Sequence, residues 1–311
     1  LNSTMQPPSR NFLITLVAVD FLFVIFGVVG NIVVIVYNTC LNANKNPTSY
    51  FVLNLAVSDL LVCGIYFPTY MVESIRVLLG TADGSNLVCQ ISFTVTSVSL
   101  ALSVVNIMVL TIDRYISITL PLRYPSIVTT KRVYIALVII WSAGLINGSL
   151  VFVSTQSTGV PLICDVDMTV ALVGAVICFY IPLTATVVFN IKIMRIAKAQ
   201  RRKIAIQQAM PSETSNSTTG SSRRNLARQF KLFKTFAVVF GCFIFCVTPF
   251  PVIAMIDVVV CGGGCIPIEV ISSAAILAGA NSVLNAFIYG VRHEEYRRAF
   301  RTLLSRPCSA F

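Results

Sequence analysis

Long apolar runs, separated by short polar stretches, dominate this sequence from one end to the other. Each run is near or above the about 20 residues that a helix needs to cross the hydrocarbon core of a bilayer. The runs cover roughly residues 12–38, 48–76, 86–119, 132–155, 167–197, 230–259 and 267–290. The pattern therefore predicts an all-α membrane protein, with a bundle of seven transmembrane helices that forms a single domain of residues 1–311.

Three polar segments lie outside the predicted transmembrane helices. Residues 1–11 are expected to be an extracellular tail, and residues 198–229 a flexible cytoplasmic loop, because Ser, Thr, Asn and Gly fill the centre of that loop. Apolar side chains recur at helical spacing in residues 291–311, with arginines between them: Tyr296, Ala299, Phe300, Leu303 and Leu304. This spacing predicts a short amphipathic cytoplasmic helix and a tail. Cys308 follows the helix and is either palmitoylated or a free thiol.

The composition agrees with a membrane protein and indicates its orientation. The chain is 56% hydrophobic and 11% charged, whereas soluble domains carry about 25% charged residues. Of the 23 Lys and Arg residues, only Arg10 and Arg76 fall in segments predicted to lie outside. This asymmetry predicts a multi-pass plasma-membrane protein with an extracellular N-terminus and a cytoplasmic C-terminus. The basic residues form short runs beside the bilayer and no folded basic module, so lipid is an expected partner and nucleic acid is not.

A few charged residues interrupt the apolar runs, where an isolated charge costs at least about 2.5 kcal/mol. Asp59 lies in the middle of the second run and must therefore find polar partners. Asp113 and Arg114 lie together near the end of the third run, and Cys89 lies near its beginning. At about 1.5 Å per helical residue, Cys89 and Arg114 are roughly 37 Å apart. One helix therefore joins two aqueous compartments.

Landmark residues of one receptor family occur in register with all seven runs. In order they are Gly30-Asn31, Asp59 in LNLAVSDLL, Cys89 with Asp113-Arg114-Tyr115, Trp141, Pro182, Cys246-Val-Thr-Pro249, and NSVLNAFIY from Asn281 to Tyr289. On these residues the chain resembles the rhodopsin-like (class A) G-protein-coupled receptors over essentially its whole length. Each motif alone is weak, whereas the complete set is very specific. The resemblance does not assign a subfamily.

The resemblance implies an allosteric sodium ion around Asp59, and no other cofactor. The expected sodium site consists of Asp59, Ser103, Asn281, Asn285 and Asn31. The alternative is a protonated Asp59 that only forms hydrogen bonds with the same side chains.

The resemblance also implies a set of residues that switch the receptor and couple it to a G protein. The set is Asp113, Arg114, Tyr115, Tyr289, Pro249 and Phe243. In this family, release of Arg114 from Asp113 accompanies opening of the cytoplasmic face, where a helix of the G protein docks. The alternative is a static surface ion pair, which contributes little.

Four positions depart from the family pattern. Val247 replaces a Trp in the sixth helix, Ala286 replaces a Pro in the seventh, and Asn190 replaces a Tyr in the fifth. Gln229 stands where many relatives carry an acidic partner for the arginine of the third helix, so we expect raised basal activity. Pro249 is retained and predicts a kink in the sixth helix, because Pro lacks an N–H and clashes with the preceding turn.

By the same resemblance, the ligand pocket lies among the outer halves of the third, fifth, sixth and seventh helices. Its expected lining is Thr96, Ser97, Phe93, Val247 and Phe250. Thr96 stands where amine receptors carry the aspartate that binds an ammonium group. Residues 267–290 contain no lysine, which excludes a retinal Schiff base. We expect a wider pocket than usual where Val247 replaces Trp.

Carboxylates outnumber cations around the predicted mouth of this pocket. The carboxylates are Asp20, Glu73, Asp165, Asp167, Asp257 and Glu269. A negative funnel that includes Asp20 and Glu73 would concentrate cations; the alternative is ordinary solvated loop carboxylates, although Asp20 lies inside the first run and needs a partner. We therefore expect the ligand to be a cationic or hydrogen-bonding small molecule, or a short peptide.

Covalent modifications are expected on the outer face. Cys89 and Cys164 match the disulfide of the family. Cys261 and Cys265 enclose three glycines, which allow the tight turn that a disulfide between them needs. A metal site at this pair is not favoured, because no third ligand is nearby and the outer face is oxidising. Asn2, in Asn-Ser-Thr, is a predicted glycosylation site.

The expected function is therefore a G-protein-coupled receptor that transduces an extracellular ligand to heterotrimeric G proteins, with arrestin as a further partner. An enzyme is not expected, because the sequence has no catalytic constellation and its one histidine, His293, lies on the cytoplasmic helix. Two alternatives stay open. One is a receptor-like, partner-binding protein with weak or constitutive signalling, and the other is an ion or proton transporter with relays at Asp20, Asp59 and Asp113.

Overall fold

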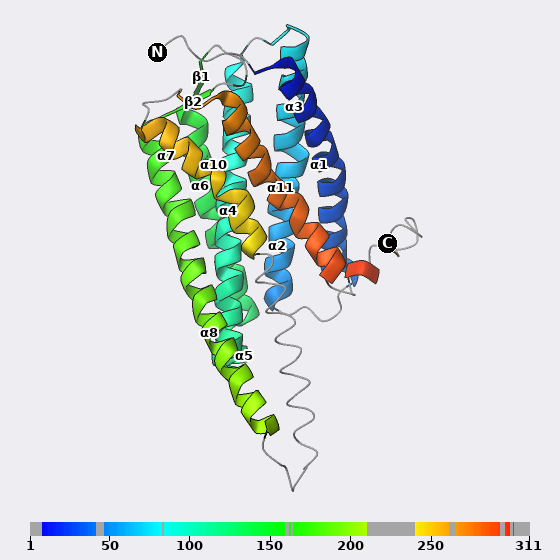
Figure 1. Cartoon of the computed structure of the whole chain (residues 1–311), viewed down its shortest axis with the longest axis vertical. Helices are drawn as coiled ribbons and strands as arrows, with labels where there is room; N and C mark the ends of the chain where they lie inside the picture. Colours follow the sequence, from blue (N-terminus) through cyan, green and yellow to red (C-terminus); the bar gives the residue numbers. More distant parts are fainter. Residues whose placement is uncertain are drawn as a thin grey trace.

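A computed structural model describes most of the chain. The described residues are 8–41, 47–82, 84–158, 162, 164–209, 240–260, 265–292, 296–298 and 301. Among them, six helices are long and apolar enough to cross a membrane: Arg10–Leu41, Ser49–Leu78, Asn86–Thr119, Thr130–Ser154, Met168–Ile196 and Ile268–Ile288. A seventh apolar helix, Phe240–Met255, is shorter in its described part. These segments match the seven predicted runs, and the prediction of a helical transmembrane bundle is confirmed (Figure 1).

The helices pack side by side around one central helix (Figure 1). That helix is α4, Asn86–Thr119, which contacts α2, α6 and α8. The first span, α1 (Arg10–Val36), contacts the second span and α11 (Ile268–Arg292). The second span consists of α2 (Pro47–Leu61) and α3 (Phe67–Leu78), the fourth is α6 (Thr130–Ser154), and the fifth consists of α7 (Met168–Ala175) and α8 (Ile181–Ala209). The helix α4 therefore connects the second, fourth and fifth spans.

In the part of the chain that the structure describes, four of the spans contain a π-helical turn, which the sequence did not predict. The turns are η1 (Tyr37–Leu41), η2 (Val62–Tyr66), η3 (Val176–Tyr180) and η4 (Ile256–Val260). Such turns insert one residue into a helix and rotate the side chains that follow it. The turn η2 therefore sets the direction of the side chains on α3, in the outer half of the second span.

The sixth span is bent where the sequence predicts a kink. Helical residues 240–247 end at Thr248, and α10 (Pro249–Met255) follows directly. The amide of Thr248 still donates to the Ile244 carbonyl at 3.1 Å. Pro249 has no amide hydrogen for the next bond of this ladder, so the helix is interrupted at this point.

Close approach between the first, second and seventh spans depends on glycine. A Cβ on Gly27 would lie 2.3 Å from the Cys63 sulfur, and one on Gly279 would lie 2.6 Å from the ring of Phe67. Both distances are shorter than any van der Waals contact. The three spans can therefore pack this tightly only because these two positions carry no side chain.

The part of the C-terminal amphipathic helix that the structure describes packs against the end of the first span. Tyr296 is buried, and its ring centroid lies 4.4 Å from that of Tyr37. The side-chain amide of Asn38 donates to the Tyr296 hydroxyl at 3.1 Å. Arg297 and Arg298 are exposed, as an amphipathic helix requires. Cys308 lies outside the described residues.

Two short strands connect the fourth and fifth spans, where no strand was expected. The strands β1 (Thr155–Ser157) and β2 (Cys164–Val166) pair antiparallel, with Gln156 opposite Asp165. They lie at the same end of the bundle as the beginning of α4 (Figure 1). A three-residue strand carries too few residues for a periodic pattern to reveal it.

Candidate functional site

Asp59 lies fully buried in the second span and meets one of its predicted partners directly. Its Oδ2 accepts a hydrogen bond from the Asn285 side chain at 3.0 Å, and its Oδ1 has no partner among the described residues. Asn31 does not bond this carboxylate: its amide donates to the carbonyls of Gly27 and Ser282 at 3.0 and 3.1 Å. The carboxylate is therefore only half satisfied, and Asn31 instead ties the first span to the seventh.

A small cavity joins the predicted sodium site to the floor of the predicted ligand pocket. Its volume is about 30 Å³, close to the space that one water molecule takes. Ser103 and Asn281 of the predicted sodium site line it, together with Thr96, Val247 and Phe250 of the predicted pocket. Two groups beside it, Asn281 Oδ1 and Ser99 Oγ, are buried with no partner among the described residues.

Two predicted pocket residues lie elsewhere. The Asn147 side chain donates to the Ser97 hydroxyl at 2.6 Å, so Ser97 connects α4 to α6. Phe93 is half-buried one turn nearer the outer end of α4 and is not part of the cavity lining. Of the five expected lining residues, three therefore converge on the cavity.

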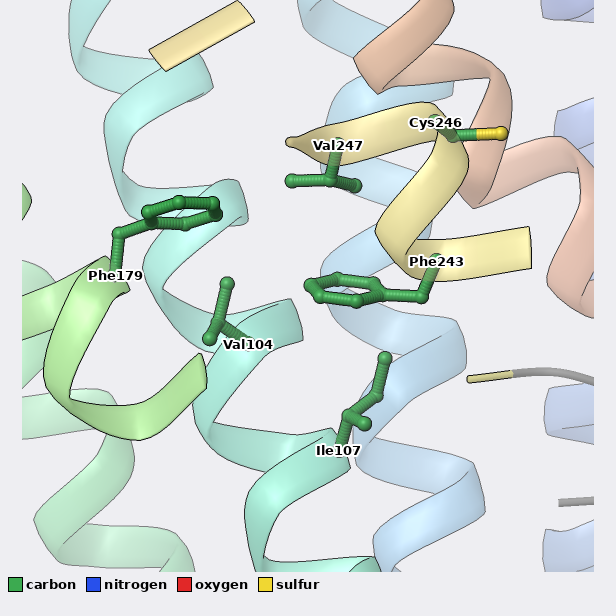
Figure 2. Packing of buried hydrophobic residues seen from close by; sticks show 6 residues of the cluster. All are labelled: Val104, Ile107, Phe179, Phe243, Cys246 and Val247. Atoms are coloured by element: carbon green, nitrogen blue, oxygen red, sulfur yellow. The ribbon is translucent and has the colours of Figure 1, made fainter. Parts of the chain in front are cut away.

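An apolar cluster lies below the cavity, between α4, the fifth span and the sixth span. Val247 is 2% exposed and packs with Phe179 and Phe243 (Figure 2). Val104 and Ile107 of α4 complete the packing around the Phe243 ring. These side chains occupy the space around Val247, so the cavity stays small and the wider pocket that we expected at this position is not observed in the described residues.

The inner end of α4 carries a partly buried ion pair. Asp113 is 2% exposed, and its Oδ2 accepts hydrogen bonds from Nε of Arg114, at 3.0 Å, and from Nη2. The Tyr124 hydroxyl donates to the other oxygen, Oδ1, at 2.7 Å. Tyr115 makes an edge-to-face contact with Phe189 of α8. Sequence reasoning missed Tyr124, because only the short helix α5 (Tyr124–Ile127) brings this loop residue back to Asp113.

The three substitutions within described helices have local structural explanations. Ala286 packs against Gly30, whose Cβ would lie 2.8 Å from the Ala286 side chain, and α11 continues through this position without interruption. Asn190 is buried and donates to the Thr186 carbonyl of its own helix at 2.9 Å. Val247 belongs to the apolar cluster. The side chain of Tyr289 and all of Gln229 lie outside the described residues.

Most carboxylates of the expected outer funnel have structural partners. Glu73 is buried and paired with Arg76 at 3.3 Å. Asp167 accepts hydrogen bonds from two amides at the beginning of α7, and Asp257 accepts from the amides of residues 265 and 266. Glu269 accepts from the Ser9 amide at 2.8 Å. These carboxylates stabilise turns and helix ends, which weakens the expectation of a negative funnel.

Asp20 is the exception. It is fully buried, 0% exposed, in the outer half of α1. Neither of its carboxylate oxygens has a hydrogen-bond partner among the described residues. The sequence indicated that this residue needs a partner, and the described part of the chain does not supply one.

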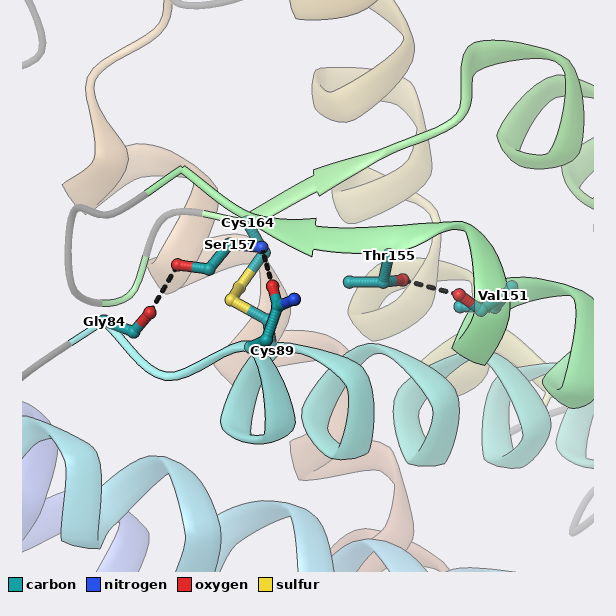
Figure 3. Close-up of a disulfide and its surroundings, with 7 residues drawn as sticks. Gly84, Cys89, Val151, Thr155, Ser157 and Cys164 are labelled. Carbon is teal, nitrogen blue, oxygen red and sulfur yellow. Dashed lines mark hydrogen bonds between the residues drawn. A yellow bond between two sulfur atoms is a disulfide. The ribbon is translucent and has the colours of Figure 1, made fainter.

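A disulfide holds the hairpin to the outer end of α4. Cys89 and Cys164 are bonded, with their Cα atoms 5.6 Å apart (Figure 3). Next to it, the Ser157 amide donates to the Asn86 side chain and the Ser157 hydroxyl donates to the Gly84 carbonyl. The structure thus contains the disulfide that the resemblance implied. Cys265 is disulfide-bonded, whereas its expected partner Cys261 and the glycosylation site Asn2 lie outside the described residues.

Comparison with known proteins gives one consistent result. Residues 30–289 match the family model described as 7 transmembrane receptor (rhodopsin family). The alpha-1A adrenergic receptor of Bos taurus is 28% identical over 99% of this chain and 72% of its own length. The receptor of the same name from Mus musculus is 28% identical over 92% of this chain, which spans 66% of that relative. The one from Canis lupus familiaris is 30% identical over 73% of this chain and 85% of its own length.

The family match identifies the class of protein to which the chain belongs. The matching family consists of receptors, which supports the expectation that the chain is not an enzyme. The six membrane-length helices within the described residues make it a multi-pass membrane protein. The chain belongs to the rhodopsin family of 7 transmembrane receptors.

Proposed function

We propose that this receptor transmits the binding of an extracellular ligand across the plasma membrane to a heterotrimeric G protein. One observation carries the proposal: a single helix, α4, takes part in all three functional regions. Its outer end is bonded to the hairpin through Cys89, its middle lines the cavity at Thr96 and Ser103, and its inner end carries Arg114. A ligand that binds two arrangements of such a helix with different affinities shifts the population between them.

In this proposal, Arg114 is the element released on activation. In the described structure it is held by Asp113, which Tyr124 also binds. Movement of the inner ends of the helices would separate Arg114 from Asp113 and expose a cationic surface for the G protein. Arrestin would use the same opened face, with the lipid bilayer as the surrounding solvent.

We further propose that the ligand is cationic or hydrogen-bonding, a small molecule or a short peptide. The relatives reported above are named as adrenergic receptors. Thr96 in the cavity lining offers a hydroxyl and no charge, so a cationic ligand needs a carboxylate from another helix. The partners found for Glu73, Asp167, Asp257 and Glu269 leave Asp20 as the buried outer carboxylate available among the described residues.

The proposal is tested by measuring guanine-nucleotide exchange in cells that express this receptor and several chimeric G proteins. A panel of amines, neutral hydrogen-bonding compounds and short peptides is applied from outside. We expect exchange to rise above that of mock cells with at least one compound. A voltage-clamp recording that shows ion flux without nucleotide exchange would favour the transporter alternative, and neither response with any compound would favour a partner-binding protein.

We also propose that Asp59 and the neighbouring cavity bind one sodium ion. The fit rests on three buried oxygens without partners in the described residues, namely Asp59 Oδ1, Asn281 Oδ1 and Ser99 Oγ, and on a volume suited to one small ion or water. Asp59, Ser103, Asn281 and Asn285 would hold the ion, and the bound ion would neutralise the buried carboxylate. This would stabilise the present arrangement of the second, third and seventh spans.

Replacing sodium chloride with N-methylglucamine chloride is expected to lower the Tm of the purified receptor by about 2 °C, the shift given by an ion at a few times its Kd. Asp59→Asn should abolish the difference, because the neutral amide cannot hold the ion by charge. Asp165→Asn removes an exposed charge and should leave the difference unchanged. A sodium-dependent shift that persists in Asp59→Asn would exclude this site.

A further inference from the structure

A buried carboxylate without a partner is expensive in the membrane interior. Asp20 lies about 15 Å along α1 from its first residue, at about 1.5 Å per residue, and is 0% exposed. Both of its oxygens are inaccessible and have no partner among the described residues. Unpaired charges within transmembrane helices are rare and usually mark a site that binds something.

The chain offers no cation of its own to Asp20 within the described residues. Arg76 of α3 is paired with Glu73 and also donates to the Thr81 carbonyl. Arg10 is exposed at the first residue of α1. Neither guanidinium forms a hydrogen bond with Asp20, as shown by the two Asp20 oxygens, which have no partner among the described residues. Among the described residues no cation neutralises Asp20, so its buried carboxyl is neutralised either by a proton or by a cation that binds beside it.

The span that packs against the helix of Asp20 carries two aromatic side chains. Tyr66 and Tyr70 lie on the second span, which packs against α1. The two tyrosine rings are stacked, with centroids 5.7 Å apart. The Tyr70 hydroxyl is already bonded to the Ser272 hydroxyl of α11 at 2.8 Å. The first, second and seventh spans thus form a corner that contains one carboxylate without a hydrogen-bond partner among the described residues and two aromatic rings. The two hydroxyls in this corner, of Tyr70 and Ser272, already bond each other.

This chemistry selects an organic ammonium over a metal ion. A carboxylate beside aromatic rings is the combination that recognises ammonium groups, through ionic hydrogen bonds and cation–π attraction. An alkali or alkaline-earth ion needs several oxygen ligands, and the hydroxyls of Tyr70 and Ser272 already bond each other. Tyr66 also lines the central cavity, together with Thr96. A ligand with its cationic end at Asp20 would therefore lie next to the cavity.

We infer that the ammonium group of the ligand binds Asp20 in the corner formed by α1, the second span and α11, with Tyr66 of η2 and Tyr70 of α3 as its aromatic walls. The cationic anchor of this receptor is then on the first span and not at Thr96 of α4. This inference rests on the proposed function for the identity of the ligand as an agonist, but the binding itself does not require a G protein.

The test measures the Tm of the purified full-length receptor in lipid nanodiscs, without G protein, against phenethylammonium chloride and against the neutral 2-phenylethanol. Wild type is expected to gain about 3 °C from the ammonium compound at ten times its Kd, and no comparable gain from the alcohol. Asp20→Asn should weaken ammonium binding roughly tenfold or more, since an ionic hydrogen bond is lost. Asp20→Glu keeps the charge and should retain binding.

Asp165→Asn is the matched control, because it removes an exposed carboxylate from the same end of the molecule. Equal losses in Asp165→Asn and Asp20→Asn would overturn the inference, since surface electrostatics would then explain binding. It would also fail if Asp20→Asn bound phenethylammonium as wild type does, or if the alcohol stabilised wild type as strongly. If Asp20→Asn does not fold, retained binding in Asp20→Glu together with the contrast between amine and alcohol still decides the question. Absence of G-protein activation in the cell assay would leave this binding result intact.

Discussion

The Asp113→Asn receptor is expected to activate a G protein without ligand at several times the rate of wild type. The carboxylate holds Arg114 through two hydrogen bonds and is 2% exposed, whereas the Arg114 side chain is 18% exposed. A charged pair of this kind contributes about 1.5 kcal/mol when it is partly buried, less than a fully buried pair would. Its loss shifts a two-state equilibrium by about tenfold toward released Arg114.

Two further variants separate release of Arg114 from general destabilisation. Tyr124→Phe removes one hydrogen bond to Asp113 and keeps the ion pair, so we expect a smaller rise of about two- to threefold. Arg114→Ala should abolish activation, with or without ligand, because the arginine itself is the proposed contact. Arg123→Gln alters an exposed arginine of the same loop and should leave basal activity unchanged.

The measurement is ligand-independent nucleotide exchange, normalised to receptor on the cell surface. Asp113→Asn at or below the wild-type rate would show that the ion pair is a static surface feature. Wild type with no signal above mock cells would remove the separate expectation of raised basal activity that was based on Gln229.

The transmembrane helices could be predicted from the sequence because their cause is local. A span needs about 20 apolar residues whatever surrounds it, so run lengths alone located the six long helices and part of the seventh. The kink before Pro249 was predictable for a similar reason, since the missing amide belongs to that residue. The π-helical turns and the hairpin β1–β2 were not predicted, because they depend on packing between spans and leave no period in the sequence.

The site was predictable where its residues are neighbours in sequence and less so where the fold brings them together. Asp113 and Arg114 are adjacent, and their bond follows from that. Tyr124 bonds the same carboxylate from a loop, and only the position of α5 reveals it. Asn31 was expected at Asp59 from the family resemblance, but its amide is satisfied by two backbone carbonyls. A polar residue near a buried charge therefore need not face it.

The roles of the outer carboxylates also depend on contacts that only the fold creates. Counting charges around the mouth suggested a negative funnel, yet Asp167 caps α7 and Asp257 holds two amides of the following loop. The sequence alone cannot distinguish a capping carboxylate from a free one. Asp20 could be singled out in advance only because it lies well inside an apolar run.

Cys89→Ser is expected to cause the largest loss of stability among simple substitutions outside the cavity. The disulfide spans 75 residues of sequence, and closing a loop of that size stabilises a chain by up to about 4.5 kcal/mol in the loop-entropy model. Insertion of α4 and α6 in the bilayer already restricts the reduced chain, so this figure is an upper bound. A decrease of about 10 °C in the Tm of purified receptor corresponds to it.

The bond also positions the hairpin over the outer end of α4, together with the hydrogen bonds of Ser157 to Asn86 and Gly84. Reduced ligand affinity should therefore accompany the loss of stability. Cys40→Ser, which changes an exposed free thiol, is the control and should match wild type. Because both cysteines act through one bond, Cys89→Ser, Cys164→Ser and the double variant should lose the same stability. Losses that add in the double variant would instead mean that each thiol contributes by its own packing.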